Sequence, residues 1–228
     1  MKKDLINYKI TNKPLKILAN GNVNGIDTSF FSPSNFSESE NIKLKKQLGV
    51  NKNDFVFIFV GRIVGDKGMN ELVAAFDKLS KEKENVKLLL VGPFEADLDP
   101  LKKKTIATID TNKQIISLGF QKDVRPYFAI ADALAFPTYR EGFPNVLLQA
   151  GAMGLPSIVT NINGCNEIIE ENKNGLIIPV KNTPLLFQAM LQIMKDTNMK
   201  RKAREMITSR FEQKVVWEAL LTEYKSLE

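Results

Sequence analysis

The stretch FVFIFVGRIVGDKGMNELVAAFDKLSKEK, residues 55–83, decides the fold of this 228-residue chain. Its first six residues form a continuous apolar run, which is typical of a strand buried on both faces of a sheet. After a glycine-rich turn, apolar side chains recur at helical spacing, at Met69, Leu72, Val73, Phe76 and Leu79. The stretch therefore predicts a buried strand followed by an amphipathic helix.

The same alternation continues along the chain. Further strands are predicted for VKLLLVG (86–92), QIISLG (114–119), ALAFPT (133–138), PSIVT (156–160) and GLIIPV (175–180). Helices are predicted near Leu98–Thr108, Val124–Ala131, Pro144–Met153, Pro184–Lys195 and in the tail from Phe211. Apolar strands joined by helices predict a mainly parallel sheet with both faces covered, a doubly wound α/β domain. Before it, LKILAN (Leu15–Asn20) is predicted to form a short strand.

The composition limits the possible catalytic groups and indicates the cellular compartment. No run of 18 or more apolar residues occurs and the start has no apolar signal region, so we expect a cytoplasmic protein. The single Cys165 argues against a structural zinc site, and the absence of histidine excludes histidine-based triads and metal motifs. Catalysis would have to rest on carboxylates, lysine, arginine, backbone amides or a cofactor.

The net charge of +6 includes a dense basic run, Lys195–Arg210, that could attract phosphates, nucleic acid or an anionic membrane. Apolar residues recur through this run at helical spacing, at Met194, Met199, Ala203, Met206 and Ile207. That periodicity favours the solvent-exposed face of a surface helix over a nucleic-acid site.

The loop after the first strand, GRIVGDKG (61–68), suits a phosphate group. Its three glycines allow close approach, the following helix presents free N–H groups, and Arg62 and Lys67 add positive charge. It matches neither the dinucleotide nor the P-loop fingerprint. An ordinary strand-to-helix turn with two solvated cations would contain the same residues.

The loop YREGFPNV, residues 139–146, follows another predicted strand and opens another helix. Pro144 suits a helix's first turn, and the amides of Asn145 and Val146 would point forward without partners. Glu141 either supports the helix start or accepts hydrogen bonds from hydroxyl groups. Gln149, one turn beyond Asn145, is either a ligand contact or an amide at the edge of the core.

The loop TNINGCNEIIE, residues 160–170, is predicted to turn into a short helix near Cys165. Cys165 itself reads as a small buried residue.

Taken together, several segments resemble the nucleotide-binding half of GT-B glycosyltransferases, and most of all the retaining family called GT4 or glycosyl transferases group 1. They are NGID (24–27), GRIVGDKG (61–68), LLLVG (88–92), SLGFQKDV (117–124), ADALAFPTYREGFPNVLLQAGAMGLPSIVT (131–160) and NEII (166–169). The resemblance implies a Rossmann-like domain, one half of a GT-B fold. It also implies transfer of a sugar from a nucleotide diphosphate donor to an acceptor hydroxyl, with retention and without a metal or other cofactor.

The resemblance also assigns roles to residues. Arg62 and Lys67 match the basic pair that neutralises the donor diphosphate, and Glu141 matches the first carboxylate of a Glu-x7-Glu motif, which binds hydroxyls of the donor sugar. These three are the implied catalytic residues. The implied donor-binding set is Gly61, Arg62, Lys67, Glu141, Gly142, Phe143, Asn145, Val146 and Gln149.

Two positions depart from the family pattern. Gln149 stands where the second carboxylate grips the ribose, so its uncharged bond should be weaker by about 1 kcal/mol. Pro144 often corresponds to glycine in the family and has no amide to donate.

The family also has an acceptor-binding domain that precedes the donor-binding one. We interpret residues 1–33 as a remnant of the interdomain linker and residues 34–228 as the nucleotide-sugar-binding domain. The expected ligand is a UDP- or GDP-hexose, and the expected process is bacterial surface polysaccharide synthesis, with peripheral membrane contact by the full-length enzyme. The domain alone should not catalyse transfer. Alternatives are a GT-B-like nucleotide-sugar epimerase, a non-catalytic nucleotide-binding module or a nucleic-acid-binding module.

Overall fold

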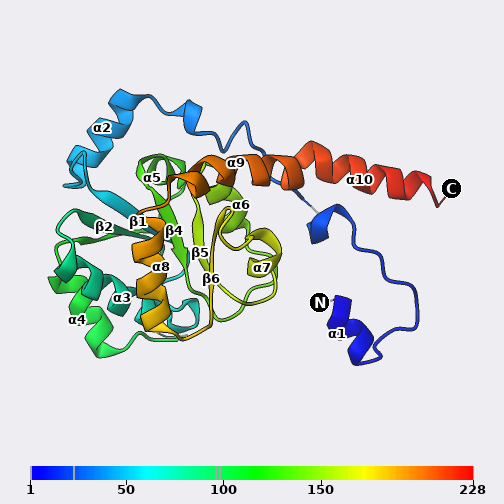
Figure 1. Cartoon of the computed structure of the whole chain (residues 1–228), viewed down its shortest axis with the longest axis horizontal. Coiled ribbons are helices and arrows are strands. Elements are labelled where there is room, and N and C mark those ends of the chain that lie inside the picture. The colour runs from blue at the N-terminus through cyan, green and yellow to red at the C-terminus, as the bar shows by residue number, and fades with distance from the viewer. Residues whose placement is uncertain (1, 23, 96, 98, 228) are drawn as a thin grey trace.

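The computed structural model describes residues 2–22, 24–95, 97 and 99–227. Within them, six parallel strands form one sheet in the order β3-β2-β1-β4-β5-β6 (Figure 1). The strands are β1 (Phe55–Val60), β2 (Val86–Val91), β3 (Ile115–Gly119), β4 (Ala133–Phe136), β5 (Ser157–Thr160) and β6 (Gly175–Ile178). The predicted doubly wound α/β fold is confirmed, and its strand order is that of a Rossmann domain.

Strand order reverses between β1 and β4, because the chain first builds outward from β1 through β2 to β3. It then returns to place β4 on the other side of β1, where Phe57 pairs with Ala133 and Ile58 with Leu134. At such a reversal the loops at the carboxyl ends of the two central strands diverge to opposite faces and leave room for a ligand. A ligand site is therefore expected in the loops after Val60 and Phe136.

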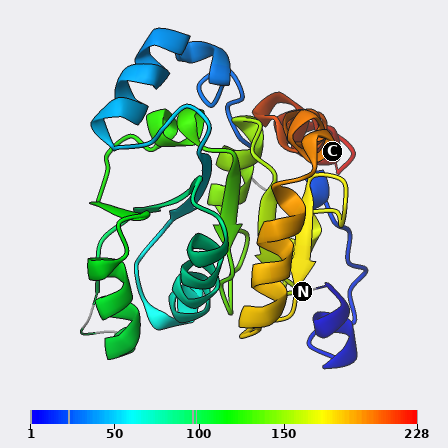
Figure 2. The ribbon, with the colours of Figure 1, turned by 60° about the vertical axis from the view of Figure 1, so that its left-hand side comes forward.

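Helices cover both faces of the sheet (Figure 2). On one face, α3 (Met69–Glu82) packs against α4 (Lys103–Thr111) and α8 (Thr183–Ile193). On the other, α6 (Asn145–Ala152) packs against α9 (Thr197–Phe211), and α2 (Glu38–Gln47) against α5 (Arg125–Ile130). The short α7 (Cys165–Ile168) lies beside α6 and β5. Three 3-10 turns, η1 (Ala19–Gly21), η2 (Pro33–Asn35) and η3 (Gly65–Lys67), and the terminal helices α1 (Lys2–Asn7) and α10 (Gln213–Lys225) complete the described elements.

The core is the apolar sheet with the inward faces of these helices. The central residues of β1, Val56 to Phe59, are fully buried, as expected for a strand covered on both sides. The predicted helical face of α3, from Met69 to Leu79, is buried against the sheet. The basic run forms α9, where Met199, Ala203 and Ile207 are buried, so the predicted surface helix is confirmed.

Three details differ from the sequence prediction. Leu15–Asn20 does not form a strand; its end enters the 3-10 turn η1, where Asn20 has φ of 55°. The helix predicted near Leu98–Thr108 begins only at Lys103, after Pro100, and Leu98 lies outside the described residues. Helix α2 was not predicted, because its hydrophobic periodicity is weak and no residue on it is buried; a capping box formed by Ser37 and Glu40 starts it instead.

The segment that precedes the sheet contacts the C-terminal helices. Ile26 forms a bridge with Glu212, between α9 and α10, and the Arg204 guanidinium donates to the carbonyls of Thr28 and Phe31. Helix α10 extends past the sheet, and α1 lies away from it (Figure 1). Among the described helices, none is both long and apolar enough to cross a membrane.

Candidate functional site

The two loops at the strand-order reversal meet at the carboxyl edge of the sheet. The first, residues 61–68, joins β1 to α3, and the second, residues 137–144, joins β4 to α6. Gly68 has φ of +71°, and a Cβ there would overlap with the carbonyl oxygen of Pro137, so only glycine allows this approach. The Tyr139 amide donates to the carbonyl of Asp66 at 2.8 Å. The backbone thus holds the two predicted ligand loops in direct contact.

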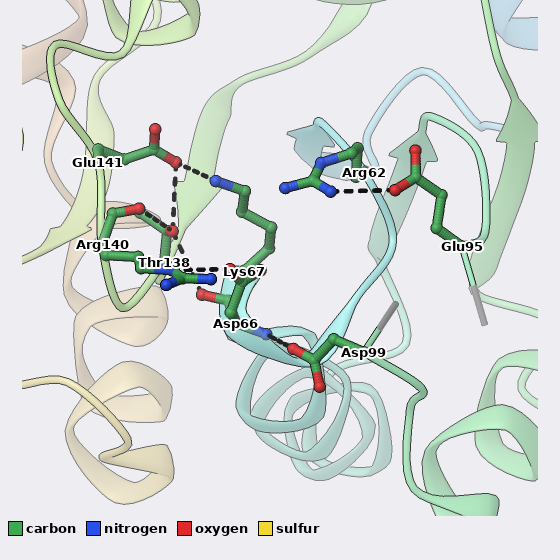
Figure 3. A network of polar contacts seen from close by, with 8 residues as sticks. All are labelled: Arg62, Asp66, Lys67, Glu95, Asp99, Thr138, Arg140 and Glu141. Atoms are coloured by element: carbon green, nitrogen blue, oxygen red, sulfur yellow. Dashed lines mark hydrogen bonds and ion pairs between the residues drawn. The ribbon is translucent and has the colours of Figure 1, made fainter. Parts of the chain in front are cut away.

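Lys67 and Glu141 form an ion pair across these loops (Figure 3). Lys67 Nζ lies 2.5 Å from Glu141 Oε1, and the two side chains are only 14% and 17% exposed. The fully buried Thr138 places its hydroxyl 3.2 Å from the same carboxylate oxygen. The structure therefore brings together two of the three predicted catalytic residues and adds a third group that the sequence did not single out.

Arg62 has a different partner. Its Nη1 lies 3.0 Å from Glu95 Oε2, in the loop after β2, and the two side chains are 45% and 30% exposed. In Figure 3 the guanidinium lies on the side of Lys67 away from Glu141. The hydrogen bond that Arg62 donates to Glu95, and then the charge of Glu95, raise the pKa of Arg62. Arg62 and Lys67 are both at the predicted edge, but of these two cations it is Lys67 that contacts the carboxylate of Glu141.

Two aspartates shape the turn that carries Lys67. Asp99 accepts the Asp66 amide at 2.5 Å through its side chain, and its carbonyl accepts the Gly65 amide at 3.1 Å. Asp66 in turn accepts a hydrogen bond from Arg140 Nε at 3.2 Å, and of the two side chains only that of Arg140 is exposed. These contacts join the loops after β1, β2 and β4. The sequence gives no spacing signal for Asp99, because it lies 33 positions from Asp66.

The start of α6 offers free backbone donors next to Glu141. The amides of Phe143, Asn145 and Val146 have no acceptor within the described part of the chain, as expected at a helix N-terminus. Gly164, with φ of +82°, supports this turn, because a Cβ there would overlap with the carbonyl oxygen of Gly142. The structure thus leaves the predicted donors unpaired beside the ion pair.

The other predicted site residues lie around this centre. Gln149 is half-buried on α6, one turn after the exposed Asn145, and Gly142 is exposed. Gly61 directly follows β1, and its amide donates to the carbonyl of Val91. Its neighbour Arg62 is therefore placed at the strand end.

Two further side chains, Cys165 and Tyr139, have raised pKa values. Burial, with a smaller contribution from the charge of Glu141, raises the pKa of Cys165 to about 12. Burial, followed by the hydrogen bond to Glu71, raises the pKa of Tyr139 above its ordinary range. Cys165 is fully buried, which agrees with its interpretation as a structural residue.

The arrangement can bind an anion next to a hydroxylated group. It combines two cations, three unpaired amides and a carboxylate that has one oxygen occupied. Cations and amides bind phosphate oxygens, whereas a carboxylate accepts from hydroxyls. Within the described residues, no group of acidic or cysteine side chains is placed to hold a metal ion. Independence from metals stays a prediction.

The chain is similar in sequence to known proteins. The sequence profile of the family described as Glycosyl transferases group 1 matches residues 40–210. Among curated proteins, the chain is 27% identical over 217 residues to the capsular polysaccharide biosynthesis glycosyltransferase CapM of Staphylococcus aureus. That match covers 93% of this chain and 55% of CapM. The chain spans about half the length of the curated relatives it matches.

Solved structures share the fold. HepE of Anabaena, crystallised with UDP and glucose, superposes with a TM-score of 0.74 at 24% identity, over 89% of this chain and 55% of HepE. HepE has also been solved with UDP alone and with UDP-glucose. The C-terminal domain of a glycosyl transferase group 1 family protein, LpcC, from Francisella tularensis gives 0.71 at 22% identity. The superposition covers 82% of this chain and 99% of that domain, so the fold is that of such a C-terminal domain.

Proposed function

Since the chain belongs to the glycosyl transferases group 1 family, we propose that it is the donor-binding domain of a retaining glycosyltransferase. The parent enzyme would move a sugar from a nucleotide diphosphate sugar to an acceptor hydroxyl, in bacterial surface polysaccharide synthesis. The name of CapM, a capsular polysaccharide biosynthesis enzyme, supports that process.

The observation that carries the proposal is the meeting of Lys67 and Glu141 where strand order reverses (Figure 3). A nucleotide sugar carries a diphosphate next to a sugar ring with hydroxyl groups. A site that binds it therefore needs cations and a carboxylate close together. Lys67 and Glu141 come from different loops, 74 positions apart, and are adjacent only because of the fold.

Each group has a proposed role. Lys67 and Arg62 bind the diphosphate and stabilise the charge that develops on it as the sugar leaves, which removes the need for a metal. The amides of Phe143, Asn145 and Val146, beside Gly142, bind phosphate and sugar oxygens at the positive end of α6. Glu141 accepts hydroxyls of the sugar, and Gln149 contacts the ribose. Gly61 places Arg62 at the strand end.

We propose residues 1–33 as the linker from an acceptor-binding domain and residues 34–228 as the donor-binding domain. Transfer requires donor and acceptor to be held together, and that contribution is lost without the other half of the cleft. The chain alone should therefore bind nucleotide without transferring sugar. For the whole enzyme we propose a cytoplasmic location, with contact at the inner face of the membrane.

Calorimetric titration with UDP and with GDP tests the proposal. One of the two should bind, and Arg62→Ala should weaken that binding by about tenfold or more, because a hydrogen bond to a charged phosphate is lost. Arg201→Ala is the matched control. Arg201 is also exposed, but it lies at the opposite edge of the sheet, next to Phe55 at the start of β1.

Absence of any nucleotide binding would contradict the proposal, as would equal losses in the two arginine variants. Duplex DNA titrated at two salt concentrations tests the nucleic-acid alternative. The structure argues against that alternative, because Lys200 and Arg210 on α9 are paired with Asp132 and Glu170, and Arg204 with backbone carbonyls. A steep loss of DNA binding with salt would support it.

A further inference from the structure

Thr138 lies directly under the carboxylate of Glu141, in the loop after β4. We propose that Thr138 is a positioning residue that holds one oxygen of Glu141, so that the other oxygen receives the hydroxyls of the donor sugar. The inference rests on the proposed function and extends it to a residue that does not itself touch the donor.

The two oxygens of Glu141 have different surroundings. Oε1 receives both Lys67 Nζ, at 2.5 Å, and the Thr138 hydroxyl, at 3.2 Å. Oε2 has no hydrogen-bond donor among the described residues, and Figure 3 shows it pointing away from both partners of Oε1. One oxygen is therefore fixed to the protein and the other is available to a ligand.

The Thr138 hydroxyl has one proton and three oxygens within reach. Besides Glu141 Oε1, the carbonyls of Arg140 and Asp66 lie 3.3 and 3.4 Å away. The carboxylate is both the nearest acceptor and the charged one, and charge-assisted bonds are the stronger kind. Because Thr138 is fully buried, water does not compete for this proton.

The backbone of Thr138 is held by hydrogen bonds to neighbouring loops and strands. The hydroxyl of Thr160, at the end of β5, donates to the Thr138 carbonyl, and Thr160 is also fully buried. The neighbouring Tyr139 amide binds Asp66. The position of the Thr138 hydroxyl is therefore set by the sheet and not by the flexible end of a long side chain.

This fixed donor matters once a ligand arrives. A bound diphosphate carries more negative charge than Glu141 and draws Lys67 toward it. Glu141 then keeps only Thr138 as its partner on Oε1. Without that bond, the carboxylate would lose its orientation at the moment when it must accept the sugar hydroxyl.

The test compares the binding of the free nucleotide with the binding of the nucleotide sugar. UDP and UDP-glucose are titrated into the wild-type chain, Thr138→Val, which keeps the shape but loses the hydroxyl, and Thr138→Ser, which keeps the hydroxyl. Thr138→Val should bind UDP within about twofold of wild type and UDP-glucose about tenfold or more weakly, as expected for one lost bond to a charged group. Thr138→Ser should bind both ligands with wild-type affinity.

Thr28→Val serves as the matched control, since Thr28 is buried and also donates to a carboxylate, that of Glu212, which is not one of the proposed site residues. It should leave both affinities unchanged. If Thr138→Val does not fold, Thr138→Ala, which also removes the hydroxyl, replaces it. Unchanged UDP-glucose binding in the hydroxyl-free variant, or an equal loss for UDP, would overturn the role of Thr138. If the wild-type chain binds GDP instead of UDP, the same variants are compared with GDP and GDP-sugars. Failure of the wild-type chain to bind UDP, GDP or any of their sugars would instead contradict the proposed function.

Discussion

Replacing Glu141 by glutamine should strengthen the binding of UDP, although Glu141 lies in the proposed site. In the ligand-free protein the carboxylate holds Lys67 at 2.5 Å, in a place that is 14% to 17% exposed. Lys67 must leave this ion pair before it can bind the diphosphate. Glu141→Gln keeps the side-chain shape and the contact with Thr138 but removes the charge.

The magnitude follows from the strength of that pair. A hydrogen bond to a charged group contributes about 1.5–3 kcal/mol, and neutral acceptors give roughly half of that. Glutamine should therefore make Lys67 easier to release by about 1 kcal/mol, which corresponds to roughly fivefold tighter UDP binding. UDP-glucose should gain less, because the weaker amide oxygen then accepts the sugar hydroxyl.

Isothermal titration calorimetry with UDP and UDP-glucose measures both effects. Glu218→Gln, an equal charge change on an exposed residue of α10, controls for the net charge of the protein. Weaker UDP binding by Glu141→Gln, or the same gain in Glu218→Gln, would refute the idea that the ion pair competes with the diphosphate.

Three further predictions concern neighbouring residues. Gly68→Ala should lower the free energy of unfolding by about 2–4 kcal/mol in a urea titration, because a Cβ at φ of +71° would overlap with Pro137; wild-type stability would show that the loops are not held there. Gln149→Glu should bind UDP more tightly by about 1 kcal/mol if this residue accepts from the ribose; unchanged calorimetric affinity would assign it to the core edge. Since the folded pKa of Cys165 is raised to about 12, its thiol should resist alkylation at pH 8 until the protein unfolds. For the same reason the protonated thiol favours the folded state fully below about pH 9, and this contribution is lost as the pH rises toward 12. The loss should be smaller in Cys165→Ala, and equal alkaline sensitivity of the two proteins would contradict it.

Much of the fold could be predicted because apolar runs and helical periodicity are local signals. The strand Phe55–Val60, the face of α3 and the surface helix α9 all follow from residue types within a few positions of one another. Helix α2 was missed because its signal is the capping box Ser37–Glu40 and not an apolar face. The prediction of a strand at Leu15–Asn20 was wrong, since an apolar pattern alone does not reveal whether a neighbouring strand pairs with it.

The site was predictable in its residues but not in its pairings. Glycines and cations after strands mark the loops, and the family resemblance supplied the roles. The partners of those residues lie far along the chain, as with Glu95 for Arg62 and Asp99 for the turn before Lys67. Thr138 carries no motif of its own, and only its burial beneath Glu141 reveals it.

Amide chemical shifts that locate UDP and GDP on the protein give the sharpest test of the proposed site. The nucleotide that binds should shift the amides of Arg62, Lys67, Asn145 and Val146, at the carboxyl ends of β1 and β4. Changes centred instead on Asp132, Lys200 and Arg201, at the opposite edge of the sheet, or no changes at saturating UDP and GDP, would contradict it.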